Sequence, residues 1–146
     1  MHLPKEEMEL LEKCGKSFDR LVLEGKYDRV HPEINSERFP ILDFGRRDFF
    51  QKPFRFQGFF YWQFVVAEME KEGYRPANVR EALVFGALRP QAQIEHTSIV
   101  ALGAKAKIEN DWRVFALEGI GRRRTLDLEM MERCFDRHTS FLGVRK

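Results

Sequence analysis

The sequence predicts a single domain of the α+β class, and three observations support this prediction. The length of 146 residues suits one hydrophobic core. Helical patterns dominate the chain up to about residue 90, while the remainder is typical of β-strands separated by glycines. Because the predicted helices and strands follow one another in blocks and do not alternate, a parallel βαβ sheet is disfavoured.

Residues 1–40 are predicted to form a helical segment followed by a loop. Pro4 suits a first helical turn, and the apolar stripe that follows it ends at a glycine. A second helix is expected from Ser17, its N-cap, to Glu24, where another glycine stops it. Residues 26–40 contain prolines, an asparagine and a serine, so we expect an extended loop.

Residues 41–146 are predicted to form the α+β domain itself, within one compact unit overall. Apolar and polar side chains alternate at Phe54–Gln57, as in a half-buried strand. Residues 62–69 then have the i, i+3, i+4, i+7 spacing of an amphipathic helix, and Gly73 supplies its left-handed stop. After a brief extended piece, Asn78 with a glutamate three positions later is a capping-box pattern that begins another helix.

The last third of the chain predicts antiparallel strands. Glycines and other turn residues separate these apolar segments. The segment Glu129–Arg137 is compatible with a short helix or with a long loop. The predicted strands are Thr97–Leu102, Arg113–Leu117, Arg124–Leu128 and Ser140–Val144.

Residues 65–83 resemble the two-helix passage of C-type-lectin-like domains. In that passage one helix ends at a glycine, a Gly-aromatic-Arg-x-Ala segment follows, here Gly73–Ala77, and a capped helix begins. The strand that ends at Lys146 is also similar to the terminal strand of that fold. The resemblance covers residues from about 54 to 146, and it implies two helices packed on a curled antiparallel sheet.

The departures from this family concern its ligands. The disulfides of the family and its calcium and sugar tripeptides have no counterpart here, so carbohydrate binding is not implied with the fold. The chain is also similar, over most of its length, to a group of short uncharacterised bacterial proteins, and this resemblance implies no activity. It is carried by Glu24–Asp28, Gly73–Ala77, Ser98–Gly103 and Val144–Lys146.

Composition and charge exclude several classes of protein. A hydrophobic share of 43% with 14 phenylalanines is too apolar for a disordered chain. The net charge of +2 disfavours a histone-like or polybasic nucleic-acid binder. Residues 74–146 nevertheless contain ten arginines, whose planar guanidinium groups make forked contacts with anions.

The sequence predicts a cytoplasmic location without membrane association. The first seven residues lack the apolar region of a secretory signal, and the longest apolar run is far shorter than the ~20 residues of a membrane span. Cys14 and Cys134 belong to no metal-binding or redox pattern. Two unlinked thiols are favoured over a disulfide bridge, in keeping with a reducing compartment.

The run Phe59–Trp62 is the preferred candidate for a partner surface. Four consecutive aromatic residues cannot all face one way on a strand or a helix. Part of the run is therefore expected in solvent, where aromatic clusters mark surfaces for a partner or for a second copy. The alternative is that the whole run belongs to the core. The candidate residues are Phe59, Tyr61 and Trp62.

Arg122, Arg123 and Arg124 form the densest charge cluster in the chain. In a functional interpretation they grip phosphate or carboxylate groups from the end of a strand. In a structural interpretation they form a solvated edge that discourages aggregation between strands. Arg46 and Arg47 could join them in space, with nearby aromatic residues offering base stacking.

Glu109-Asn110-Asp111-Trp112 lies between two predicted strands and allows two interpretations. Clustered oxygen ligands before an aromatic residue are compatible with a calcium loop. Asn and Asp also favour hairpin turns, because they bond their own backbone and tolerate the left-handed region, and the turn is preferred. Trp112 at the end of this segment is included in the candidate partner surface.

The remaining chemistry-bearing residues form no recognisable site. The four histidines (His2, His31, His96 and His138) lack metal-ligand spacing, although His96, His138 and a carboxylate could in principle meet. Ser98, Asp136 and His138 could be drawn as a triad, but no nucleophile elbow supports it. No cofactor, metal site or catalytic residue is predicted, and an enzyme is disfavoured.

Two functional hypotheses follow from these observations. The first is a non-enzymatic binding module on a lectin-like scaffold, with a protein or glycan ligand. The second is a nucleic-acid-associated protein that uses the Arg-rich second half. The N-terminal helices lie outside the lectin-like region, and they are a surface through which a second copy could pair.

Overall fold

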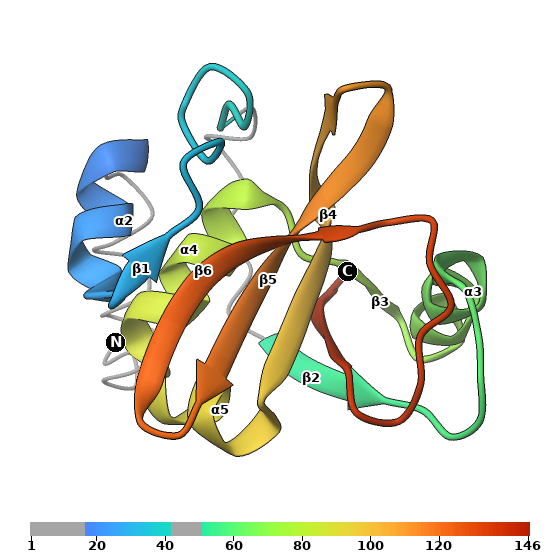
Figure 1. Ribbon diagram of the computed structural model, residues 1–146. Coiled ribbons are helices and arrows are strands. Elements are labelled where there is room, and N and C mark those ends of the chain that lie inside the picture. Colours follow the sequence, from blue (N-terminus) through green and yellow to red (C-terminus); the bar gives the residue numbers. More distant parts are fainter. Residues whose placement is uncertain (1–16, 42–50) are drawn as a thin grey trace, which may run out of the picture.

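The computed structural model describes residues 17–41 and 51–146. Within these residues a seven-stranded sheet carries helices on both of its faces (Figure 1). The α+β class predicted from the sequence is confirmed. The first predicted helix, Cys14 and the Arg46-Arg47 pair lie outside the described residues.

The sheet is open and its strands run in both directions. In chain order the strands are β1 (Arg29–Val30), β2 (Gln51–Arg55), β3 (Tyr74–Pro76), β4 (Ser98–Ile108), β5 (Asp111–Ile120), β6 (Arg123–Met130) and β7 (Ser140–Arg145). They lie in the order β1-β6-β5-β4-β7-β2, and β3 also pairs with β7. The strands β4, β5 and β6 form an antiparallel meander, as the sequence predicted for this region.

Two strand pairs are parallel, which corrects the prediction of an antiparallel sheet. The strand β7 runs parallel to β4, with Ser140 opposite Ile99, and β1 runs parallel to β6. Residues 131–139 carry the chain from β6, on one side of the meander, to β7 on the other side (Figure 1). Pairing direction depends on this crossover, which leaves no periodic signal in the strands themselves. For the segment Glu129–Arg137, the sequence allowed a short helix or a long loop. Glu129 and Met130 instead end β6, and residues 131–137 form a loop without a helix.

Four helices lie in the described residues. They are α2 (Phe18–Gly25), α3 (Trp62–Lys71), α4 (Val79–Leu88) and α5 (Pro90–His96). The predicted positions of the first three are confirmed, and Ser17 caps α2 by accepting the backbone N–H of Arg20 at 3.3 Å. In this part of the chain, no helix combines the length and the apolar character that a membrane crossing requires.

The start of α4 confirms the predicted capping box. The side chain of Asn78 accepts the backbone N–H of Glu81, and the Glu81 carboxylate accepts the backbone N–H of Asn78, each at 2.9 Å. Arg75 adds a forked ion pair to the same carboxylate, with both N···O distances at 2.7 Å. Gly73, with φ of 80°, ends the turn after α3 in the left-handed conformation predicted for it.

The helix α5 is absent from the sequence-based prediction. Pro90 is its first residue, a position where the missing N–H of proline costs nothing. Its Gln93 is almost completely buried and donates through Nε2 to the carbonyl oxygens of Glu118 and Thr125, both at 2.8 Å. This contact fastens α5 to the β5–β6 hairpin, so tertiary hydrogen bonds support a helix of only seven residues.

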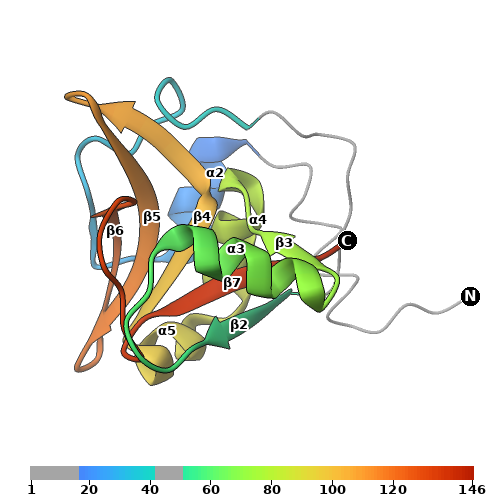
Figure 2. The same ribbon diagram turned by 90° about the vertical axis from the view of Figure 1, so that its right-hand side faces the viewer.

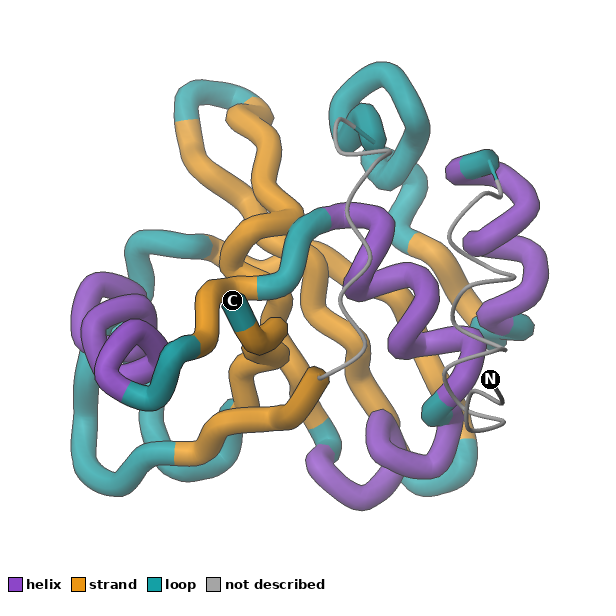
Figure 3. The backbone as a smooth tube through the Cα atoms, turned by 180° about the vertical axis from the view of Figure 1, so that it is seen from behind, coloured by secondary structure: helices purple, strands orange, loops and turns teal. Residues whose placement is uncertain are grey.

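Each face of the sheet has its own hydrophobic core. On one face α2 and α4 pack against alternate side chains of β4, β5 and β6, such as Leu117 and Leu126, and α4 and α5 lie across the strands in Figure 3. On the opposite face α3 crosses β7 (Figure 2) and covers a phenylalanine-rich core. Members of this second core include Phe54, Phe60, Phe135 and Phe141.

The β4–β5 hairpin is longer than predicted and projects beyond the rest of the sheet (Figure 1). Its two-residue turn consists of Glu109 and Asn110, with φ of 52° and 70°. Positive φ at both positions is the signature of the tight turns that match strand twist. The prediction of a hairpin turn at Glu109–Asp111 is therefore confirmed.

Candidate functional site

An aromatic surface lies in the segment that leads into α3 and at the start of this helix. The side chains of Phe59, Tyr61 and Phe64 are 83%, 54% and 43% exposed, and we call these three residues the aromatic surface. Phe60, between the first two, is 6% exposed. The expectation that consecutive aromatic residues divide between core and solvent is confirmed at these positions.

The aromatic surface is supported by a rigid frame. Phe60 and Phe135 exchange two backbone hydrogen bonds, of 3.1 and 2.7 Å, which join this segment to the crossover loop. The ring of Phe60 packs against Phe56, Phe64 and Phe141, with ring centroids 5.6 to 5.8 Å apart. Because Phe60 is anchored in the core, its exposed neighbours are held in place at little further entropic cost.

Trp62 has a different role from its neighbours, which corrects its assignment to the exposed surface. It is only partly exposed and packs against the second core. Its indole Nε1 donates to a carboxylate oxygen of Glu132 at 3.0 Å. Trp62 therefore fastens the first turn of α3 to the crossover loop.

A pocket of about 290 Å³ adjoins the aromatic surface. Phe59 and its two preceding residues form one wall, and three residues of the crossover loop form the other. Within the loop the Asp136 carboxylate accepts the backbone N–H of His138 at 2.9 Å. Arg137 is exposed and has no ion-pair partner in residues 17–41 and 51–146. The lining residues are Gln57, Gly58, Phe59, Asp136, Arg137 and His138.

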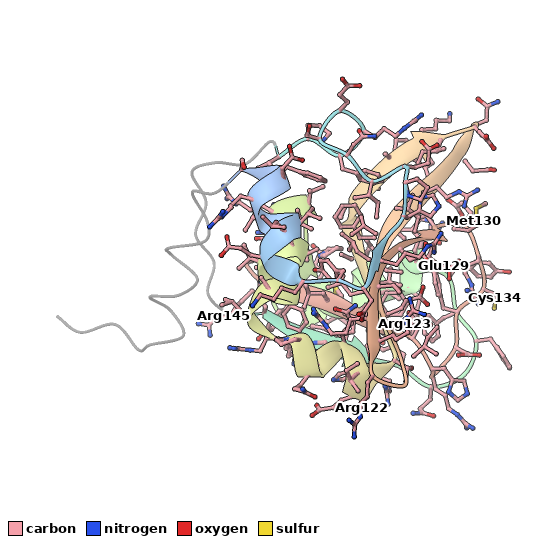
Figure 4. All side chains as sticks on the ribbon, turned by 60° about the vertical axis from the view of Figure 1, so that its left-hand side comes forward. Arg122, Arg123, Glu129, Met130, Cys134 and Arg145 are labelled. Atoms are coloured by element: carbon pink, nitrogen blue, oxygen red, sulfur yellow. The ribbon has the colours of Figure 1, made fainter. Side chains whose placement is uncertain are left out.

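The three consecutive arginines do not form one cluster. Arg122 and Arg123 are exposed at the turn between β5 and β6, toward one end of β6, and Glu129 and Met130 lie toward its other end (Figure 4). The guanidinium group of Arg124 points inward instead and makes three hydrogen bonds. Arg124 is therefore removed from the candidate ligand surface.

Arg124 is the centre of a polar network between the sheet and the helices. It donates to the carbonyl oxygens of Gly25 and Gly86, both at 2.7 Å, and to the side chain of Gln93 at 3.0 Å. Its guanidinium group also lies 5.0 Å from the centre of the Tyr27 ring. Burial raises the pKa of the Tyr27 hydroxyl far above its ordinary value, against the opposing effect of the Arg124 charge. The network serves the fold.

Trp112 lies far from the other candidates. It is 41% exposed near the tip of the projecting hairpin, with the ammonium group of Lys105 located 5.1 Å from its ring centre. Arg122 follows the opposite end of β5, so roughly 26 Å of strand separates these two predicted site residues. The candidates thus fall into three places: the aromatic surface, the hairpin tip and the β5–β6 turn.

The His, Cys, Asp and Glu residues of the described part of the chain form no group that could hold a metal ion. The carboxylate of Asp136 bonds the backbone of His138, as in an Asx turn, which does not support the triad. The His96 ring bonds the Ser140 hydroxyl at 2.9 Å, and burial, followed by the Arg55 charge, lowers its pKa.

Glu118 lies close to a second carboxylate on the neighbouring strand. It lies on β5 near Asp127 of β6, on the face of the sheet opposite Leu117 and Leu126. Burial and then the charges of Asp127 and Glu129 raise the pKa of Glu118, and a hydrogen bond with Asp127 adds to this effect. The raised pKa of Glu118 makes its protonation state depend on folding, which has consequences for stability.

Sequence reasoning missed two residues of the site. Phe64 falls outside the apolar stripe of residues 62–69, so the helical spacing places it on the exposed side of the helix. The sequence pattern could therefore have identified Phe64 as an exposed aromatic residue. Arg137 has no such signal, because only the crossover loop brings it to Phe59. No protein-family model, curated protein or solved structure matches this chain.

Proposed function

We propose that this protein is a non-enzymatic interaction module that binds a protein partner through Phe59, Tyr61 and Phe64. The observation that carries the proposal is the combination of three exposed aromatic side chains with a buried, hydrogen-bonded neighbour. Exposed aromatic clusters are typical of partner surfaces, since they bury much apolar area when a partner covers them. Little of that gain is lost to ordering here, because Phe60 fixes the segment.

The lectin-like comparison adds support for a binding scaffold. In the sequence, the two helices joined by Gly73–Ala77 and the strands that follow are the features that resemble that fold. Such scaffolds present ligand surfaces on loops that rest on a rigid sheet. A glycan ligand is the alternative within this class, because aromatic rings also pack on sugars.

Site-specific photocrosslinking tests the proposed surface. A benzophenone amino acid is placed at position 59, and, in a matched control, at Ile120, which is 73% exposed at the end of β5. We expect irradiation in cells to give discrete protein adducts from position 59 and none from position 120. The adducts from position 59 should disappear when Tyr61 and Phe64 are both replaced by serine. Equal labelling from both positions, or no protein adduct from position 59, would contradict the proposal.

A nucleic-acid-associated function is the competing proposal. Two groups of exposed cations favour a nucleic-acid function. One is Arg122 with Arg123, and the other is Lys105 with Lys107 beside Trp112 on the projecting hairpin. The net charge of +2 and the inward orientation of Arg124 oppose it. Phosphate contacts release counterions, so such binding weakens steeply with added salt, whereas an aromatic protein contact does not.

A fluorescent single-stranded oligonucleotide distinguishes the two functions. For the interaction module we expect no binding at physiological salt. Binding that falls steeply with salt and is lost in the Arg122→Glu/Arg123→Glu variant would instead establish the nucleic-acid function. Both side chains are exposed, so the variant is expected to keep the far-UV circular dichroism spectrum and unfolding midpoint of the parent.

A further inference from the structure

We infer that the partner segment bound at the aromatic surface is acidic, with an apolar side chain on Phe59 and an adjacent carboxylate paired with Arg137. This inference rests on the proposed function and names the chemistry of its partner. Phe59 lies in one wall of the pocket and provides the apolar contact. Arg137 lies in the other wall and provides the positive charge.

The size of the pocket favours part of a peptide over a small molecule. Its volume of about 290 Å³ is at the lower limit for small-ligand sites. The highly exposed Phe59 borders it on one side, so an apolar side chain that enters the pocket would also cover this ring. A peptide segment can place one side chain there and continue across Tyr61 and Phe64.

The charges around the pocket point to a carboxylate as the second element. The Asp136 side chain is occupied by the backbone N–H of His138. Arg133, on the same crossover loop, is already engaged, since it pairs with Glu129 at 2.7 Å. Arg137 has no ion-pair partner in the described part of the chain, so its guanidinium group can donate two parallel hydrogen bonds to a carboxylate.

A single guanidinium group also argues against a phosphate backbone as the occupant. Polyanion binding gathers several cations along a groove. Here Arg137 is accompanied by the Asp136 carboxylate in the same pocket, and that negative charge would repel closely spaced phosphates. Asp136 repels a lone carboxylate as well, but the single guanidinium group of Arg137 can match one negative charge, whereas it leaves a run of phosphates largely unmatched.

Selection from a random twelve-residue peptide library tests this inference. The full chain is the target, with Arg137→Glu as the charge-reversed variant and Phe59→Ser as the variant without the ring. Arg122→Glu is the matched control, because it reverses an exposed arginine on the β5–β6 turn. Circular dichroism spectra establish that all the variants are folded before selection.

We expect the parent chain to enrich peptides that place Asp or Glu beside an aromatic or aliphatic residue. A selected peptide should bind Arg137→Glu at least tenfold more weakly than the parent and Arg122→Glu as tightly as the parent. Selection on Arg137→Glu should in turn enrich Lys or Arg. Peptides without acidic residues, or equal losses in the two arginine variants, would overturn the inference.

The same selection separates failure of the inference from failure of the proposed function. Enriched peptides that lack acidic residues but lose binding in Phe59→Ser would leave the interaction module intact and refute only its acidic specificity. If no enriched peptide depends on Phe59, the aromatic surface is not a peptide-binding surface, and both proposals fail.

Discussion

At the scale of single residues, neighbouring side chains of the same chemical type have opposite roles. Arg122 is solvated, whereas Arg124 two positions later bonds two helix carbonyl groups and the buried Gln93. Gly86 belongs to the same network, since a Cβ atom there would collide with the Tyr27 hydroxyl. Removing Arg124 would therefore leave carbonyl groups without their donors, a far larger cost than removing a solvated charge.

Replacing Arg124 by methionine is expected to lower the free energy of unfolding by about 3 kcal/mol. The matched variant Arg122→Met should change it by less than about 0.5 kcal/mol, because that side chain is solvated. Urea unfolding followed by circular dichroism measures both values. Similar losses in the two variants would show that the inward contacts of Arg124 contribute little to stability.

Glu118 gives the protein a pH dependence with a definite sign. Its pKa in the folded state is raised above the ordinary value of 4.5, so the folded state binds its proton more tightly than the unfolded state. The contribution of this residue to stability is therefore lost as the pH rises from about 4.5 through the raised value. The variant Glu118→Gln should be more stable than the parent at pH 7, by about 0.5 kcal/mol, and equal to it at pH 4.

Unfolding midpoints of Glu118→Gln in urea at the two pH values test this prediction. A gain of the same size at pH 4 and pH 7 would mean that the effect comes from packing and not from the charge of Glu118. A loss of stability at pH 7 would show that the hydrogen bond with Asp127 outweighs the repulsion between the carboxylates.

At the scale of elements, the start of α4 depends on Asn78. Its side chain satisfies one of the free backbone N–H groups in the first turn of the helix, and Glu81 satisfies the backbone N–H of Asn78 in return. The ion pair with Arg75 holds Glu81 in this position. Three local residues therefore fix where the helix begins.

The variant Asn78→Ala is expected to lower the free energy of unfolding by about 1 kcal/mol. Asn78→Ser should restore most of this loss, because a serine hydroxyl accepts the same backbone N–H. Thermal unfolding of the three proteins under one condition provides the comparison. Equal midpoints for the alanine and serine variants would assign the loss to packing around Asn78 rather than to the capping hydrogen bond.

At the scale of the whole molecule, the segment before α3 and the start of α3 expose three aromatic side chains beside the crossover loop. Phe59 and Phe60 are adjacent in the chain, but Phe59 lies on the surface and Phe60 lies in the core. Both belong to a segment that the Phe60–Phe135 bridge fastens to the loop. A comparison of the two residues therefore separates binding from folding.

The variant Phe59→Ser is expected to change the free energy of unfolding by less than about 0.5 kcal/mol. Phe60→Ser should lower it by about 3 kcal/mol or more, since a buried ring is removed from a packed aromatic cluster. Urea unfolding measures both values. If Phe59→Ser were as destabilising as Phe60→Ser, the aromatic surface would be part of the core and not a binding site.

The sequence by itself determined the local features of this protein. The helix caps at Ser17 and Asn78 and the turn at Glu109–Asn110 act between residues a few positions apart, so a single chain carries their complete signal. The separation of Phe59 from Phe60 is local in the same sense, because consecutive side chains point in different directions.

Only the tertiary structure decided how these elements meet. Three features each join segments that are remote in the chain. They are the parallel pairing of β4 with β7, the inward orientation of Arg124, and the position of Arg137 in the wall of the pocket beside Phe59. Their cause is the burial of apolar surface on both faces of one sheet, which selects among many arrangements that the same local patterns allow. Periodicity shows which side chains are buried, whereas the packing of the whole chain decides which residues become neighbours.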